Sequence, residues 1–364
     1  MPSLIQGFAS LDRRSNMGQT PKIEDEQLKH QQRAAAEQDE ITTDIAKKGG
    51  VSSRRLSSGG AEPHDLIDNS IDRKTRTLWG DAFGRLMKNK LAVISLIWIA
   101  LMIIVSLSAD LWVPQKFGDP REINTATATA QRLQGPSAQH WFGTDDMGRD
   151  IFGRVLYGAR VSLTVGVFAT LISLALGIFL GAISGYYGKV VDAIIMRITD
   201  IFLAFPYILF AILVMSVLPS KFKGVWAVVA VIGLLGWSTY ARLFRSSVLS
   251  VKENDYVAAG RALGASTGRL IFRHILPNAI APAVVYATMG VGGAILTESA
   301  LSFLGIGVQP PSISWGRMID DGRAFLTSHF SLVAFPGLAI LLTVLAFTLL
   351  GDGVRDALDV KMED

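Results

Sequence analysis

The chain alternates polar segments with apolar stretches that are long enough to cross a lipid bilayer. A hydrocarbon core about 30 Å thick needs ~20 helical residues at about 1.5 Å each. Few of these stretches carry the polar face that a buried helix of a large soluble protein would need. The pattern therefore predicts an all-α, polytopic membrane protein with six transmembrane helices. The six stretches are residues 91–113, 161–186, 198–219, 225–243, 279–303 and 331–352.

The overall composition agrees with this pattern. Half of the 364 residues are hydrophobic and the mean hydropathy is +0.36, which is too apolar for one ordinary soluble domain. The first apolar stretch begins near Leu91, beyond the usual position of a signal peptide, and we expect it to remain as the first span. The chain has no cysteine, which excludes disulfides and thiolate chemistry.

Basic residues cluster where the chain first approaches the membrane. Residues 73–90 contain six Lys or Arg residues against one acid, Asp81, and apolar side chains recur there at helical spacing. We expect an amphipathic helix in the headgroup region, and because basic flanks favour the cytoplasmic side, we predict a cytoplasmic N-terminus. Six spans return the C-terminus to the cytoplasm, and the basic segment 242–273 falls on the same side. Lys221 and Lys223 fall outside, against the trend.

The motifs give no support for catalysis by this chain. The stretch YYGKV at 186–190 is only superficially like a phosphate loop, which needs a glycine where Ile183 stands and a hydroxyl where Val190 stands. The five histidines are scattered without zinc-ligand spacing, and no Ser/His/Asp arrangement can be argued. We therefore expect no catalytic residue, no metal site and no cofactor in this chain.

Acidic residues in or near the spans are the next candidates, because charge inside a membrane is costly and often functional. Glu298, in GGAILTESALSFLG, lies near the outer end of the fifth span. It is either a pore or gate residue or a carboxylate that is hydrogen-bonded to neighbouring helices. Asp200 follows Arg197 by three residues, which favours a pair on one helix surface. A series of membrane acids suited to an ion relay is absent, which counts against an ion-driven carrier.

Between the fourth and fifth spans lies a short polar stretch, DYVAAGRALGASTGRLIFRHILPN, that is built like two small helices. Asp255 can cap the first helix, and Gly264 can take the left-handed conformation that ends it. The Ser266-Thr267 pair can cap a second helix that runs to Leu276. Pro277 then marks the return to the membrane.

The first of these helices is expected to present small side chains to a partner. Ala258, Ala259 and Ala262 share its exposed face with Arg261. Small side chains let another surface approach closely, and the glycine bend holds the two helices in one shape. We therefore predict a compact hairpin that docks in a groove of another protein.

The hairpin sequence resembles the cytoplasmic loop of ABC importer permeases, written EAA-x3-G-x9-I-x-LP. Ala258, Ala259 and Gly260 occupy the EAA positions, while Gly264, Leu276 and Pro277 match the rest of the pattern. The departures are Ala258 in place of glutamate and His274 in place of isoleucine. The surrounding residues look like the dipeptide/oligopeptide/nickel branch of the family.

Three further stretches resemble the same branch, so that the resemblance covers about residues 73–361. The segments 140–163 and 297–316 look like those before the second span and after the fifth. The segment 349–361 looks like the terminal Gly-Asp…Arg-Asp…Leu-Asp signature, with Val360 where proline is common.

This resemblance implies a membrane subunit with the type I ABC importer permease fold, in the inner membrane of a bacterial cell. It implies a homologous second permease, two cytoplasmic ATPase subunits that bind ATP and Mg, and an extracytoplasmic solute-binding protein. The solute is expected to be a di- or oligopeptide, with nickel, glutathione or oligosaccharide as alternatives, and no nucleic acid is involved. The residues expected to couple transport to the ATPases are Ala258, Ala259, Gly260, Arg261, Gly264, Leu276 and Pro277.

The spans and the resemblance together predict the division of the chain. The predicted parts are a disordered polar cytoplasmic tail (1–72), an interfacial helix with the first span (73–113), an extracytoplasmic segment (114–160), the permease domain (161–352) and a cytoplasmic C-terminal tail (353–364). Asp145, Asp146 and Asp150 of the outer segment are interpreted as solvated acids rather than rim contacts for the binding protein.

Two other classes of protein stay open. An ion-coupled secondary transporter would show pairs of interrupted spans repeated in its two halves, and we find no convincing repeat. A membrane sensor with an N-terminal output tail would lack the hairpin. Copurification with an ATPase distinguishes the importer from both.

Overall fold

The computed structural model describes residues 78–119 and 128–359, and every regular element in these ranges is a helix. Five long helices form the bundle: α4 (Lys90–Phe117), α6 (Ile151–Tyr187), α9 (Val225–Lys252), α13 (Ala281–Phe303) and α15 (Ser331–Leu358). The shorter ones are α3 (Leu78–Leu86), α5 (Ala128–Gln131), α7 (Lys189–Ala204), α8 (Tyr207–Val217), α10 (Asp255–Ala262), α11 (Thr267–Arg269), α12 (Leu276–Ala279) and α14 (Trp315–Gly322). The predicted tail 1–72, the start of the interfacial helix and Val360 lie outside the described residues.

Each long helix is apolar and long enough to cross a membrane, so five of the six predicted spans are confirmed as candidate membrane helices. The apolar stretch 198–219 does not form one continuous helix. It is divided between α7 and α8, which meet at an angle of 85°. Pro206 explains the break, because proline lacks an N–H and forces the preceding Phe205 into extended backbone. The bent pair can still serve as one span.

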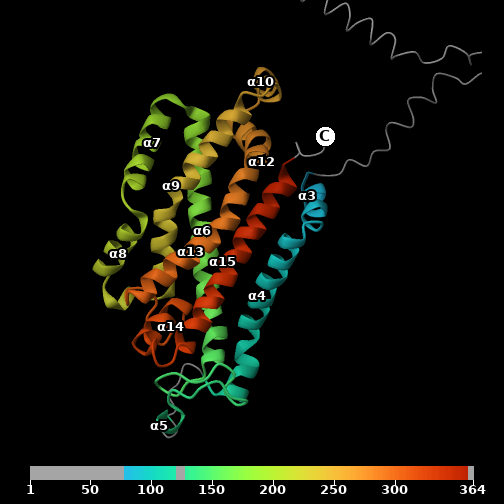
Figure 1. The fold of residues 1–364 in the computed structure, drawn as a ribbon. Coiled ribbons are helices and arrows are strands. Elements are labelled where there is room, and N and C mark those ends of the chain that lie inside the picture. Colours follow the sequence, from blue (N-terminus) through green and yellow to red (C-terminus); the bar gives the residue numbers. More distant parts are fainter. Residues whose placement is uncertain (1–77, 120–127, 360–364) are drawn as a thin grey trace, which may run out of the picture. The chain divides into compact units, whose positions relative to one another are not determined.

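Helices α3 and α10 and the end of α15 lie at one end of the bundle (Figure 1). The short helices α5 and α14 lie at the opposite end. The five long helices and the bent pair therefore connect the two ends six times. This arrangement returns the two ends of the described chain to the same side.

A stripe of glycines on α6 brings it against α9. Gly177, Gly181 and Gly185 recur every four residues along one face of α6. A methyl group added at Gly181 would lie 2.6 Å from the carbonyl oxygen of Ala241, and one at Gly185 would lie 2.8 Å from a methyl of Val248. The backbones of α6 and α9 can therefore approach each other as closely as small-residue motifs allow in membrane helices.

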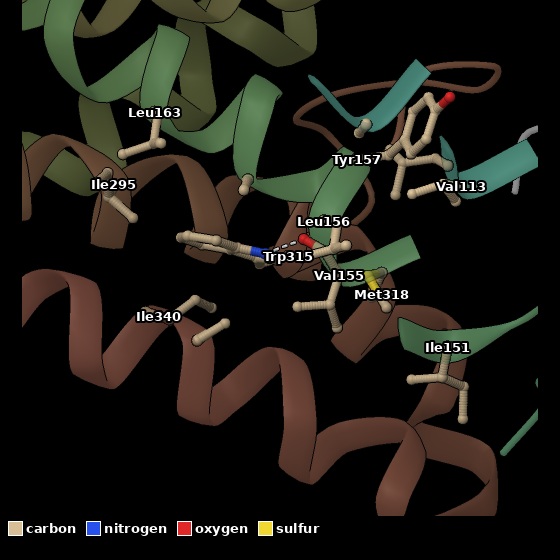
Figure 2. Close-up of a cluster of buried hydrophobic side chains, with 14 of the residues drawn as sticks. Val113, Ile151, Val155, Leu156, Tyr157, Leu163, Ile295, Trp315, Met318 and Ile340 are labelled. Carbon is tan, nitrogen blue, oxygen red and sulfur yellow. Dashed lines mark hydrogen bonds between the residues drawn. The ribbon is translucent and has the colours of Figure 1, made fainter. Parts of the chain in front are cut away.

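A cluster of buried side chains joins α6, α14 and α15, with contributions from α4 and α13 (Figure 2). Trp315 of α14 is fully buried, and its Nε1–H donates to the carbonyl of Val155 at 2.8 Å. Gly158 provides the space for the indole, since an added methyl would lie 2.9 Å from the ring. This contact fixes α14, the short helix between α13 and α15, against the start of α6.

Candidate functional site

The first arm of the hairpin is α10, and its cap lies one residue earlier than expected. Asn254 is the N-cap, with extended backbone, and its carbonyl accepts from the N–H of Val257 at 3.0 Å. Asp255 is therefore the first helical residue, and its interpretation as the cap is wrong. A carboxylate in the first turn still interacts favourably with the positive end of the helix dipole.

The bend of the hairpin is formed as predicted. Gly264 has a φ of +78°, and its N–H donates to the carbonyl of Arg261 at 3.0 Å. The N–H of Ala265 donates to the carbonyl of Gly260 at 3.1 Å. These two bonds make a Schellman motif, which requires a left-handed residue at this position. Ser266 then caps the second arm by accepting from the N–H of Arg269 at 3.4 Å.

The second arm continues beyond Pro277, which contradicts the prediction that the helix ends there. A π-helical turn, η2 (Leu270–Ile275), follows α11 and leads directly into α12, where Pro277 is the second residue. The wider turn accommodates a proline ring that would otherwise clash with the carbonyl four residues earlier. Only Ile280 separates α12 from α13. The hairpin is therefore joined to the fifth span with almost no loop.

Buried apolar side chains hold the hairpin on the bundle. Val257, Leu270 and Ile275 are almost fully buried. Val257 and Ile275 belong to one cluster with Phe244 and Val248 of α9. The hairpin is therefore packed on the C-terminal end of α9 rather than extended freely from it.

The opposite face of the hairpin is exposed. Ala258, Ala259, Arg261, Gly264 and Pro277 are all exposed, whereas Gly260 and Leu276 are half-buried. Sequence reasoning missed three large apolar side chains beside them: Tyr256, Leu263 and Phe272, with Leu263 89% and Phe272 72% exposed. The sequence offered a signal for them, because they are large apolar residues within an otherwise polar stretch. An exposed apolar patch of this kind marks an interaction surface.

Glu298 is fully buried in a hydrogen-bonded network near the C-terminal end of α13. Its two carboxylate oxygens accept from Ser162 at 3.0 Å and from Ser302 at 2.7 Å. The same serine oxygens accept from the backbone N–H groups of Trp315 and Val308. The carboxylate thus ties α13 to α6 and to the loop that follows. Of the two interpretations of Glu298, these contacts support the hydrogen-bonded carboxylate.

Asp145 and Asp150 are buried, so their interpretation as solvated side chains is wrong. Asp145 accepts from Arg149 at 2.8 Å and also from Arg154, which reaches Asp321 of α14 at 2.9 Å with its other nitrogen. Arg154 is only 4% exposed. This ion-paired cluster joins the start of α6 and the residues before it to α14.

Asp150 and Asp146 have different environments. Asp150 caps α6 by accepting from the N–H of Gly153 at 2.7 Å, and it contacts Nδ1 of His140 at 2.8 Å. Burial raises the pKa of its carboxyl. Asp146 is half-buried, and burial together with the neighbouring Asp145 raises its pKa as well. Asp200 of α7 pairs with Arg242 of α9, and not with Arg197 as predicted.

Comparisons with known proteins agree with this architecture. Residues 177–364 match the family model for "binding-protein-dependent transport system inner membrane component", and residues 77–136 match the N-terminal transmembrane domain of oligopeptide transport permease C. A dipeptide transport system permease protein, DppC, of Alkalihalophilus pseudofirmus is 47% identical over 78% of this chain and 90% of that protein. An oligopeptide permease, OppC, of Bacillus subtilis is 42% identical over 80% and 92%. A glutathione permease, GsiD, of Pectobacterium atrosepticum is 39% identical over 80% and 94%.

Proposed function

Because the chain belongs to the family of inner-membrane components of binding-protein-dependent transport systems, we propose that it forms half of an import pathway for di- or oligopeptides. The other half is a homologous permease. An extracytoplasmic binding protein delivers the peptide, and two ATPase subunits in the cytoplasm bind ATP and Mg. This chain itself is a transport component and not a catalytic subunit. Glutathione is the strongest alternative solute, because permeases for it are also close relatives.

The observation that carries this proposal is the exposed hairpin between α9 and α13. Its anchored face is packed on α9, and its second arm leads into α13 through Ile280 alone. A force applied to Ala259 and Leu263 is therefore passed to two membrane helices. Closure of the docked ATPases moves the hairpin as a rigid body, and the spans rock between inward-facing and outward-facing states.

This mechanism requires the hairpin to lie in the cytoplasm, together with both termini. The absence of native cysteine makes the test direct, since single cysteines can be labelled without a background. A Leu263→Cys variant should react with a membrane-impermeant maleimide from the cytoplasmic side only. A Met147→Cys variant, at the opposite end of the bundle, is the matched control and should react only from outside. Labelling of the first variant from outside would contradict the orientation.

Coupling is tested in the assembled transporter, with uptake and ATP hydrolysis measured on the same preparation. Ala259→Trp places a bulky ring on the proposed docking face, and Gly264→Pro cannot adopt the φ of +78°. Both variants should insert normally and lose peptide uptake, while the binding protein no longer drives productive ATP hydrolysis. Gly84→Trp is the control, because Gly84 is exposed in α3 at the same end of the molecule. Full coupled uptake in both hairpin variants would refute the assigned role.

A further inference from the structure

A cavity of about 540 Å³ lies among the helices of the bundle, beside the break between α7 and α8. Helices α6, α9 and α13 provide its other walls. The side chains that shape it include Thr170, Ser173, Tyr207, Tyr240, Tyr286 and Thr297. Glu298 is not among the residues that line it. A volume of this size is in the range of small-molecule binding sites.

The walls of this cavity are largely apolar, carry several hydroxyl groups and are uncharged. None of the described residues that line it is Asp, Glu, Lys, Arg or His. The hydroxyl of Tyr207 donates to the carbonyl of Ile232 at 3.1 Å, and that of Ser173 donates to the carbonyl of Gly233 at 2.8 Å. Each hydroxyl oxygen keeps acceptor capacity for an N–H group of a bound solute.

Two aromatic rings form one side of the cavity. The rings of Tyr240 and Tyr286 meet edge to face, with centroids 5.2 Å apart. Such rings offer apolar contact together with a polar end. Lipid-facing surfaces of this chain are different, since exposed positions of α4 such as Ile94 and Leu107 are purely apolar.

Glycines keep the α13 wall of the cavity open. At Gly290 an added methyl would lie 2.1 Å from the hydroxyl oxygen of Tyr240. Because glycine has no side chain, this hydroxyl lies directly against the backbone of α13. Gly293 lies one turn further along, is exposed, and has nothing within 4 Å of such a methyl. The space in front of Gly293 is therefore part of the cavity itself.

We propose that this cavity is the part of the import pathway that contacts the solute, and that it holds a short peptide through its backbone. The inference rests on the proposed function. Neutral hydroxyls and aromatic rings suit the amide groups that all peptides share, and the absence of wall charge avoids strong selection by peptide side-chain charge. The α9 and α13 walls are also the two helices that flank the hairpin, so hairpin movement changes the shape of the cavity.

The structure provides a substitution that fills the cavity without disturbing the fold. Gly293→Leu places a side chain in open space, so the protein should insert and assemble normally. Uptake of a dipeptide should fall about tenfold, a loss of about 1.4 kcal/mol in binding, because the leucine side chain occupies space that the solute needs. Gly337→Leu is the matched control, because Gly337 also has nothing within 4 Å, lies in membrane helix α15 and does not line the cavity. Its uptake should equal that of the unmodified transporter.

A second measurement identifies what occupies the space. In the assembled transporter, Gly293→Cys should react with a small charged methanethiosulfonate, and the peptide-loaded binding protein with ATP should slow the reaction. Gly337→Cys should not react. If Gly293→Cys does not react with the reagent and instead can be cross-linked to the second permease, a helix of that permease fills the cavity. This result would overturn the inference. Equal uptake by Gly293→Leu and Gly337→Leu would overturn it as well. If the unmodified assembly fails to import peptides, the proposed function fails instead.

Discussion

Arg154 is the residue that connects the start of α6 to α14 most directly. It is buried and pairs with Asp145, which precedes α6 in the chain, and with Asp321 of α14. Breaking a buried ion pair leaves charges that are no longer compensated. Arg154→Met should therefore destabilise the protein by about 3 kcal/mol, the low end of the usual range, because Arg149 and Arg317 still pair with the two carboxylates.

The thermal unfolding temperature in detergent checks this expectation. Arg242→Met is the matched control, because Arg242 pairs with Asp200 where both side chains are about half exposed, at 53% and 54%. Exposed pairs contribute about 1 kcal/mol or less, so its unfolding temperature should change little. An equal loss in the two variants would show that Arg154 is no more important than a surface arginine.

Asp150 gives a prediction about pH. Burial raises the pKa of its carboxyl above the ordinary value of 3.8, although the Gly153 N–H and His140 act in the opposite direction. As the pH rises above 3.8, the Asp150 carboxyl loses its proton in the unfolded chain before it does so in the folded protein. The free energy of unfolding therefore falls with rising pH until the raised pKa of the folded state is passed. Asp150→Asn keeps an acceptor for the cap and lacks the charge.

Asp150→Asn should therefore gain stability relative to the natural chain as the pH rises from 3.8 toward neutral. Paired thermal unfolding scans across this pH range measure the difference. A difference that stays constant with pH would exclude burial as the cause.

At this scale, local rules predicted what depends on neighbours in sequence. Gly264 was found because a helix end needs a left-handed residue. The burial of Asp145 was not predicted, because it depends on the packing of α14, which lies far away in the sequence. The docking residues Ala258, Ala259 and Arg261 are exposed as expected, while their binding role stays a prediction.

At the scale of elements, the α6–α9 pair depends on glycines whose neighbours are backbone atoms. Gly181→Leu would force a side chain toward the carbonyl of Ala241, which lies 2.6 Å from the position of an added methyl. Backbone atoms cannot move aside as a flexible side chain can. The loss in the free energy of unfolding should therefore exceed the ~1–3 kcal/mol of ordinary overpacking. We expect little folded protein in the membrane, measured as the fraction that elutes as a single species after detergent extraction.

Gly337→Leu, the same substitution in an open position of α15, should extract and elute normally. If Gly181→Leu behaves like it, the close approach of α6 and α9 is not needed for folding. The signal for this packing was present in the sequence as glycines four residues apart, but the pattern alone does not identify the partner helix.

The bent pair shows why length and hydropathy predict spans better than they predict their shape. Pro206 breaks the stretch 198–219, yet Pro114 lies inside α4 and Pro336 lies inside α15 without ending either helix. A proline removes one hydrogen bond in each case. Whether the helix continues depends on the neighbouring helices, which restore or replace that bond, and these are not visible in a local sequence.

At the scale of the whole molecule, the hairpin can transmit force only if its connection to α13 is stiff. Ile280 is the only residue between α12 and α13, and its backbone remains in the right-handed helical region. Inserting Gly-Gly after Ala279 adds a flexible joint at this point without altering the exposed docking face. Peptide uptake should be lost while the ATPases still bind the transporter, measured by copurification and by uptake into proteoliposomes.

Insertion of Gly-Gly after Phe222, in the connection between α8 and α9 at the other end of the bundle, is the control. It lengthens a chain that carries no force in this mechanism, so uptake should be retained. Undiminished uptake after the insertion at Ala279 would mean that α13 moves without being pulled by α12. The hairpin would then act on the spans through α9 alone, where Val257 and Ile275 are packed against Phe244 and Val248.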